Sequence, residues 1–164
     1  MKRTLVALAA LSVTALPATG MAAAIHQEVP NDPERCRAGA GPAVQITVTG
    51  VRASTGKMRV QLYRATAQDW LEKGRWIYRM EVPAQAGRMT FCMPVPEPGS
   101  YGIAVRHDIN GNRKSDIMRD GGGMSNNPSI NILNLGKPSY RRVAFSAGEG
   151  VTPIAIQMRY FSGS

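Results

Sequence analysis

The chain has 164 residues, of which 43% are apolar, 19% are charged and 6% are aromatic, and its formal net charge is +9. This balance is typical of a soluble globular domain and excludes a disordered or collagen-like chain. The longest apolar run, residues 5–16, is shorter than the roughly 20 residues that a membrane-spanning helix needs. We therefore expect one basic domain without a transmembrane segment.

The first residues have the pattern of an export signal. Lys2 and Arg3 precede the apolar run, Pro17 ends it, and small residues follow up to Ala24. We expect residues 1–24 to be a signal peptide, so that the mature protein is periplasmic or secreted. The alternative is an uncleaved segment that stays in the membrane.

Two cysteines, Cys36 and Cys92, remain after this segment. Exported proteins meet an oxidising compartment, so we expect one disulfide between them, and the alternative is two separate thiols. Neither cysteine belongs to a C-x-x-C motif, which gives no support to a redox site or a zinc ribbon.

Short runs of alternating apolar and polar residues, separated by Gly and Pro, dominate residues 44–161. A period of two indicates strands with one buried face, so we expect an all-β domain, a single antiparallel β-sandwich of about seven strands, immunoglobulin-like or transthyretin-like. An irregular leader at residues 25–43 precedes it, and residues 162–164 form a tail. The expected strands are centred on residues 44–48, 58–62, 76–82, 89–93, 101–105, 143–145 and 154–160.

Three local features refine this architecture. A turn at Gly56 predicts that the first two strands form a hairpin. One short helix is expected from Thr66, with Asp69 as its capping partner and Gly74 as its stop. Cys92 has the opposite parity to its apolar neighbours, so its thiol should leave the sheet on the outward face.

Residues 107–138 lack periodicity and are rich in Asn, Gly, Asp and Ser, and loops this long usually carry function. Oxygen-bearing side chains stand at loop positions 1, 3, 5 and 9: Asp108, Asn110, Asn112 and Asp116. Calcium takes oxygen ligands from alternate positions of a tight loop, so these four residues predict a weak calcium site and no other cofactor is expected.

Other residues count for and against this calcium site. Asp120 and Asn126 are candidates to complete the ligand shell, whereas Arg113 stands at position 6 in place of the usual glycine, and Arg119 at position 12 in place of the usual glutamate. The alternative interpretation is an Asx-rich turn whose side chains accept backbone amides. The three glycines at 121–123 offer a weak anion nest, and flexibility is their expected use.

The order and spacing of several segments resemble the exported bacterial domain of unknown function family 2141. The segments are Val44 to Val51, Gly56-Lys57-Met58-Arg59-Val60-Gln61-Leu62-Tyr63, Pro98 to Asn112, and Ser125-Asn126-Asn127-Pro128. The resemblance runs from Val44 to roughly Tyr160. It implies a β-sandwich of the cell envelope and leaves the activity open; in the family pattern a glycine usually follows the second asparagine of the loop, where this chain has Arg113.

Strand parity turns a set of basic side chains away from the apolar rows. The set consists of Lys57, Arg59, Arg75, Arg79, Arg88 and Arg106. A shared basic face predicts binding of an anionic envelope glycolipid or glycan, and the alternative is an ordinary solvated face. Aromatic residues are too sparse for a base-stacking platform, so no specific nucleic acid is expected.

Catalysis has little support in the sequence. The histidines are His26 in the leader and His107 at a strand end, and no nucleophile or metalloprotease motif occurs. We therefore expect a non-enzymatic envelope binding or accessory module. The alternatives are a calcium-stabilised structural domain and an enzyme that uses His107 and Asp108.

Overall fold

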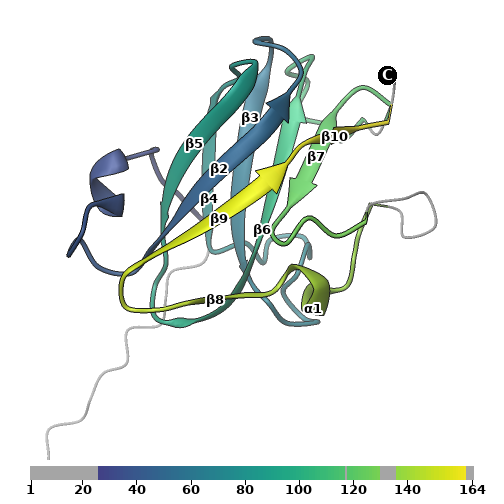
Figure 1. The fold of residues 1–164 in the computed structure, drawn as a ribbon. Helices are drawn as coiled ribbons and strands as arrows, with labels where there is room; N and C mark the ends of the chain where they lie inside the picture. The colour runs from purple at the N-terminus through teal and green to yellow at the C-terminus, as the bar shows by residue number, and fades with distance from the viewer. Residues whose placement is uncertain (1–25, 117, 130–135, 162–164) are drawn as a thin grey trace, which may run out of the picture.

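Two sheets pack face to face because alternate residues along most strands are apolar (Figure 1). A computed structural model describes residues 26–116, 118–129 and 136–161; the expected signal peptide and the tail lie outside these residues. The small sheet has the strand order β5 (Gly87–Pro94), β2 (Ala43–Val51) and β9 (Val151–Gln157).

The large sheet has seven strands, one of which, β8 (Phe145–Ala147), pairs with β6 beside the main order. The main order is β1 (Gln27–Glu28), β4 (Tyr78–Pro83), β3 (Lys57–Arg64), β6 (Gly99–Asp108), β7 (Gly121–Met124) and β10 (Arg159–Tyr160). A 3-10 helix, η1 (Pro33–Cys36), and a four-residue helix, α1 (Tyr140–Val143), lie between strands. No helix in the described part of the chain is long and apolar enough to cross a membrane.

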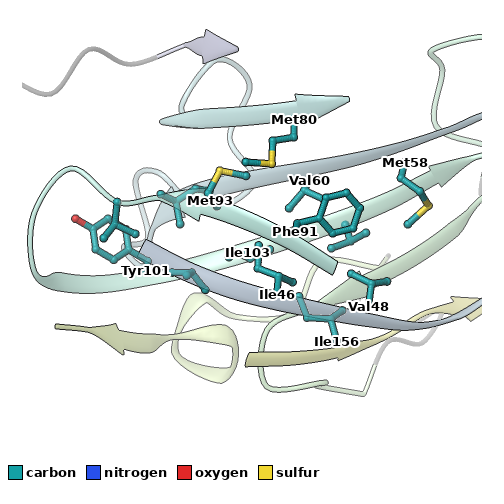
Figure 2. Packing of buried hydrophobic residues seen from close by; sticks show 14 of the residues in the cluster. Ile46, Val48, Met58, Val60, Met80, Phe91, Met93, Tyr101, Ile103 and Ile156 are labelled. Carbon is teal, nitrogen blue, oxygen red and sulfur yellow. The ribbon is translucent and has the colours of Figure 1, made fainter. Parts of the chain in front are cut away.

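The core fills the space between the two sheets (Figure 2). Ile46, Phe91 and Ile156 enter it from the small sheet, while Val60 and Ile103 enter it from the large one. All five side chains are buried. Burying each such side chain stabilises the fold by about 1.5–3 kcal/mol, so this layer supplies most of the driving force for folding.

The prediction of an all-β sandwich is confirmed, and the predicted strand count is low. Ten strands occur in the described residues, because β1 and β7 have no alternating pattern and the predicted strand at 154–160 divides into β9 and β10. Met158 donates its amide to the Thr49 carbonyl, after which the chain leaves the small sheet and joins the large one. The sandwich is also not purely antiparallel, since β2 pairs with β9 and β1 with β4 in parallel.

The predicted hairpin is wrong, because β2 and β3 belong to different sheets. Their apolar faces meet across the core instead of lying side by side, and alternation alone does not distinguish these two arrangements. Gly56 lies in the turn between them with φ +73°, and an added Cβ would collide with the backbone carbonyls of Asp108 and Ile109. This turn is therefore packed against the loop that follows β6.

The predicted helix from Thr66 is also wrong. Thr66 and Asp69 do form the expected capping contacts, and Trp70 donates its amide to the Thr66 carbonyl, which makes one helical turn. Leu71 then adopts φ +56°, a left-handed conformation that ends the helix at once. The short helix of the fold is α1, so that Val143 is helical and not part of a strand.

The predicted disulfide joins Cys36 and Cys92, with 5.8 Å between their Cα atoms. Cys92 lies on the outward side of β5 as expected, and the leader covers it there. The leader is more ordered than predicted: Asn31 donates to the Thr90 carbonyl and accepts the Cys92 amide. It thereby caps the exposed edge of β5.

The glycines 121–123 were expected to be flexible, but they form strand β7. An added Cβ on Gly121 would collide with the Tyr160 ring, and one on Gly123 would approach Ile156 to 2.7 Å. Small residues are therefore needed here because the chain end packs directly on this strand.

Candidate functional site

The predicted basic residues separate into two groups. Lys57, Arg59, Arg79 and Arg106 lie on β3, β4 and β6, on the face of the large sheet that points away from the small sheet. We call this the outer face. Arg75 lies in the segment after β3, and Arg88 lies on β5 of the other sheet and is exposed. The outer face therefore gathers four of the six predicted residues.

Acidic side chains accompany these arginines. Arg59 pairs with Glu81 on β4, Arg79 with Glu28 on β1, and the Arg106 Nη2 atom lies 3.5 Å from Asp108 Oδ2. These three arginine side chains are only 18–21% exposed. Their carboxylate partners and the surrounding protein therefore restrict the movement of each guanidinium group.

Arg79 shows how crowded the positive charge is on the outer face. Its guanidinium stacks on the Trp76 ring at 4.1 Å. Burial, and next the charge of Arg59, lower the pKa of Arg79 from its ordinary value. The outer face thus carries several fixed cations at short range.

One half of the outer face is covered by a second apolar cluster. Tyr63 and Trp70 pack edge to face at 5.4 Å, together with Met124 and Val143. The Trp70 ring lies so close to β6 that a Cβ on Gly102 would approach it to 2.7 Å. The Trp70 Nε1 atom donates to the Pro138 carbonyl, which ties the covering segments together.

Beside this cluster, and sharing Leu71 and Met124 with it, the outer face is hollowed into a pocket of about 340 Å³. Alternate residues of three neighbouring strands form its floor, and they include Arg59, Gln61, Arg106 and Gly122. Its walls hold Leu71, Met124 and Phe161 on the apolar side, and Ser115, Asp116 and Asp120 on the polar side. A concave site with apolar walls and a few polar groups is the usual form of a small-ligand site.

Arg59 and Arg106 face each other directly across β3 and β6 on the pocket floor. Like charges in this position destabilise a sheet, and Glu81 and Asp108 offset the repulsion. The Nη1 atom of Arg106 donates to Ser115 Oγ, whereas its Nε and Nη2 atoms are buried and have no hydrogen-bond partner among the residues that the structure describes.

The loop after β6 has the turn geometry that its sequence suggested. Asp108 Oδ2 accepts the amide of Arg113, Asn110 Oδ1 that of Asn112, and Asn112 Oδ1 that of Lys114. These are Asx-type contacts, the alternative interpretation of the motif. Arg113 makes the sharp turn at position 6 with φ +64°, in place of the usual glycine.

The residues proposed to complete a calcium shell lie apart. Asp120 is buried near Asp116, whose amide donates to its Oδ2 atom, and its Oδ1 atom has no hydrogen-bond partner within residues 26–116, 118–129 and 136–161. Asn126 lies beyond the opposite end of β7 and donates to the Ala144 carbonyl. Within the described ranges, no group of three or more His, Cys, Asp or Glu side chains is placed to hold a metal ion.

His107 and Asp108 do not form a catalytic pair. Consecutive residues of a strand face opposite sides, and His107 is fully buried on the core side, whereas Asp108 lies on the outer face. The His107 Nε2 atom lies 2.8 Å from the Thr55 carbonyl, which can only accept, so Nε2 carries the proton. Its Nδ1 atom then accepts from the Tyr160 hydroxyl at 2.8 Å.

Sequence reasoning missed most of the pocket. Gln61 and Leu71 were not candidates, because a polar residue in an alternating strand and an apolar one near an expected helix end carry no signal of a ligand. Ser125 was also missed as a structural residue: its hydroxyl, fully buried, donates to the Val143 carbonyl and accepts the Ile103 amide. The run Ser125 to Pro128 gave only a turn-like composition.

Comparisons with known proteins agree with the resemblance seen in the sequence. The comparisons with curated proteins and with solved structures gave no significant match. A family model described as an uncharacterized protein conserved in bacteria (DUF2141) matches residues 46–155, which include most strands of both sheets and the whole loop after β6. The chain therefore belongs to the DUF2141 family.

Proposed function

We propose that this protein is an exported, non-enzymatic binding module that holds a phosphate-bearing envelope glycolipid on the outer face of its large sheet. The export pattern of residues 1–24 and the basic net charge support this setting. The fold supports it too, because a rigid sandwich can present fixed side chains on one face without moving its backbone.

The pair of arginines on the pocket floor carries the proposal. Arg59 and Arg106 are directly opposite each other and line the same pocket. Two guanidiniums at this separation suit a phosphate group, which accepts from planar forks of donors. Glu81 and Asp108 hold the two side chains in place, so that little conformational entropy is lost when an anion binds.

Sedimentation with lipid vesicles tests this proposal. Phosphatidylcholine vesicles that contain lipid A should bind the mature protein, and phosphatidylcholine vesicles alone should not. The variants Arg59→Gln and Arg106→Gln should bind at least tenfold more weakly, since each loses a charge-assisted contact. Glutamine is preferred to glutamate because a carboxylate opposite Glu81 would itself disturb the sheet.

Arg88→Gln is the matched control, because Arg88 is an exposed arginine on the other sheet. It should bind like the parent. Equal weakening in all three variants would mean that net charge and not the pocket drives binding, which would refute the proposal. Binding to a soluble acidic glycan but not to the vesicles would replace the glycolipid with a free glycan.

A calcium-stabilised loop is the second candidate function. Arg113 makes the turn at position 6 that calcium loops need, and the Asp108 Oδ1 atom is buried with no hydrogen-bond partner in the described ranges. Four residues, Asp108, Asn110, Asn112 and Asp116, would share the ion, with a dissociation constant of roughly 0.1–1 mM.

Calorimetry with millimolar calcium tests the second candidate. The parent should release or take up heat and gain thermal stability, and the double variant with Asp108→Ala and Asp116→Ala should do neither. Absence of both effects in the parent would leave the Asx turns as the whole role of the loop. Stabilisation that persists in the double variant would place the ion elsewhere.

A further inference from the structure

We propose that the ligand of the outer-face pocket is a zwitterion, with a primary ammonium group beside its phosphate. This inference rests on the proposed function, since it assigns the phosphate to Arg59 and Arg106, and it adds a positive charge on the ligand that makes binding tighter than binding through a phosphate alone. The evidence is the distribution of charge and of unpartnered polar atoms around the pocket.

The two floor arginines already have acidic partners, Glu81 and Asp108. The acidic wall has no comparable partner. Asp116 lies 3.9 Å from Arg119, whose side chain is 71% exposed, so that this ion pair contributes little. Asp120 has no ion pair among the residues that the structure describes, although only 7% of it is exposed. Within the described residues, the charge in the pocket that lacks a partner of opposite sign is therefore the negative charge of Asp120.

One carboxylate oxygen of Asp120 also lacks a hydrogen-bond donor among the described residues. Its Oδ2 atom accepts the Asp116 amide, and its Oδ1 atom is buried with no partner in the described part of the chain. A buried carboxylate oxygen without a donor costs free energy, commonly about 1–3 kcal/mol or more. A primary ammonium supplies up to three donors and a positive charge, so it meets both needs of this side chain.

Arg106, on the floor of the same pocket, has donor atoms that lack acceptors in the part of the chain that the structure describes. Its Nε and Nη2 atoms are buried and have no hydrogen-bond acceptor among the described residues, although Nη2 lies 3.5 Å from Asp108 Oδ2 as an ion pair. Its side chain and that of Asp120 both line the pocket, so that one ligand can contact the two residues at once. A phosphate group would accept from Arg106 while the ammonium on the same molecule donates to Asp120.

The apolar wall limits the ligand further. Leu71, Met124 and Phe161 face the pocket, and Phe161 is 43% exposed. This wall suits the apolar part of an amphiphile, which would leave the zwitterionic head on the floor. The chemistry is that of phosphoethanolamine, whether it is free in solution or the headgroup of a lipid.

Calorimetric titration with two soluble probes tests the inference. Phosphoethanolamine and glycerol 1-phosphate both present a phosphate, and only the first has an ammonium. The titrations are made with a chelator present, so that calcium does not compete for Asp116 and Asp120. The parent should bind phosphoethanolamine about tenfold more tightly or better, because a charge-assisted contact is commonly worth about 1.5–3 kcal/mol.

Asp120→Asn should abolish this preference and leave glycerol 1-phosphate binding unchanged, since asparagine still accepts the Asp116 amide but lacks the charge. The free variant should be at least as stable as the parent, because it loses an uncompensated buried charge. Arg106→Gln should weaken both probes alike, and Arg88→Gln should change neither.

Equal affinity of the parent for the two probes would overturn the zwitterion and leave the anion site standing. Binding to lipid A vesicles without binding to phosphoethanolamine would also overturn it. Binding to none of these would end the proposed function itself. If phosphoethanolamine binds, co-sedimentation with phosphatidylethanolamine vesicles assigns the ligand to a lipid headgroup, and its absence assigns it to a soluble compound.

Discussion

The outer faces of the two sheets differ although both carry outward arginines. On the small sheet, Arg88 is exposed and the neighbouring Cys92 is bonded to the leader. On the large sheet, Arg59 and Arg106 are mostly buried, paired with carboxylates and joined by a pocket. An outward position therefore gives a residue no function by itself; the neighbours that strand register brings beside it decide what it can bind.

The largest expected effect concerns the small sheet. The disulfide closes a sequence separation of 56 residues, so that breaking it should reduce the free energy of unfolding by about 4 kcal/mol in the chain-entropy model. Chemical unfolding of the oxidised and the reduced protein measures this loss. Two reactive thiols in the unfolded, unreduced mature protein would show that the bond does not form.

The covered half of the outer face gives the next effect. Trp70→Phe removes the donor of the Pro138 carbonyl and part of the packing on Gly102. The free energy of unfolding should fall by about 2 kcal/mol. An unchanged unfolding midpoint in denaturant would mean that the Trp70 cluster does not stabilise the large sheet.

The buried tyrosines should make the stability of the fold depend on alkaline pH. Burial raises the pKa of Tyr160 above its ordinary value of 10.0, and its hydroxyl donates to His107 and accepts the Arg52 amide. A raised folded-state pKa leaves stability unchanged below pH 10 and reduces it as the pH rises above that value. Burial also raises the pKa of Tyr63 and Tyr101, which adds to this loss.

Tyr160→Phe separates this contribution from the others. The variant should lose about 1–2 kcal/mol at neutral pH, where the hydroxyl bonds the buried His107. It should also lose less stability than the parent between neutral and strongly alkaline pH. Unfolding curves at several pH values make the comparison, and parallel losses in both proteins would exclude Tyr160 as a source.

The smallest effect on stability belongs to the pocket floor. Arg59→Gln should change the free energy of unfolding by about 1 kcal/mol, because the lost ion pair with Glu81 is partly offset by relief of the repulsion between Arg59 and Arg106. Its effect on lipid A vesicle binding should be large by comparison. A variant that loses several kcal/mol of stability would make Arg59 a residue of the fold and not of the site.

Much of the fold was predictable because alternation reports burial directly. The strands predicted around Val60, Phe91 and Ile103 are all present, and they contribute to the core. Alternation does not report which sheet a strand joins, and for that reason the β2–β3 hairpin failed. The prediction of a helix from Thr66 failed because Leu71 adopts a left-handed conformation, which nothing in the sequence indicates for a leucine.

The candidate site was predictable only in part. Parity correctly placed Arg59 and Arg106 outside the core, and the spacing from Asp108 correctly indicated a tight loop. The pocket depends on β3, β6 and β7 lying side by side and on the loop returning Asp120 to them. These are long-range arrangements that no local motif encodes.

The most direct test of the arginine pair follows the side-chain Nε–Hε signals of arginine by NMR during titration with phosphoethanolamine. The account predicts saturable shifts of the Arg59 and Arg106 signals with one common dissociation constant, and a stationary signal for Arg88. Shifts of similar size at Arg88, or stationary signals at Arg59 and Arg106 while the ligand binds, would contradict it.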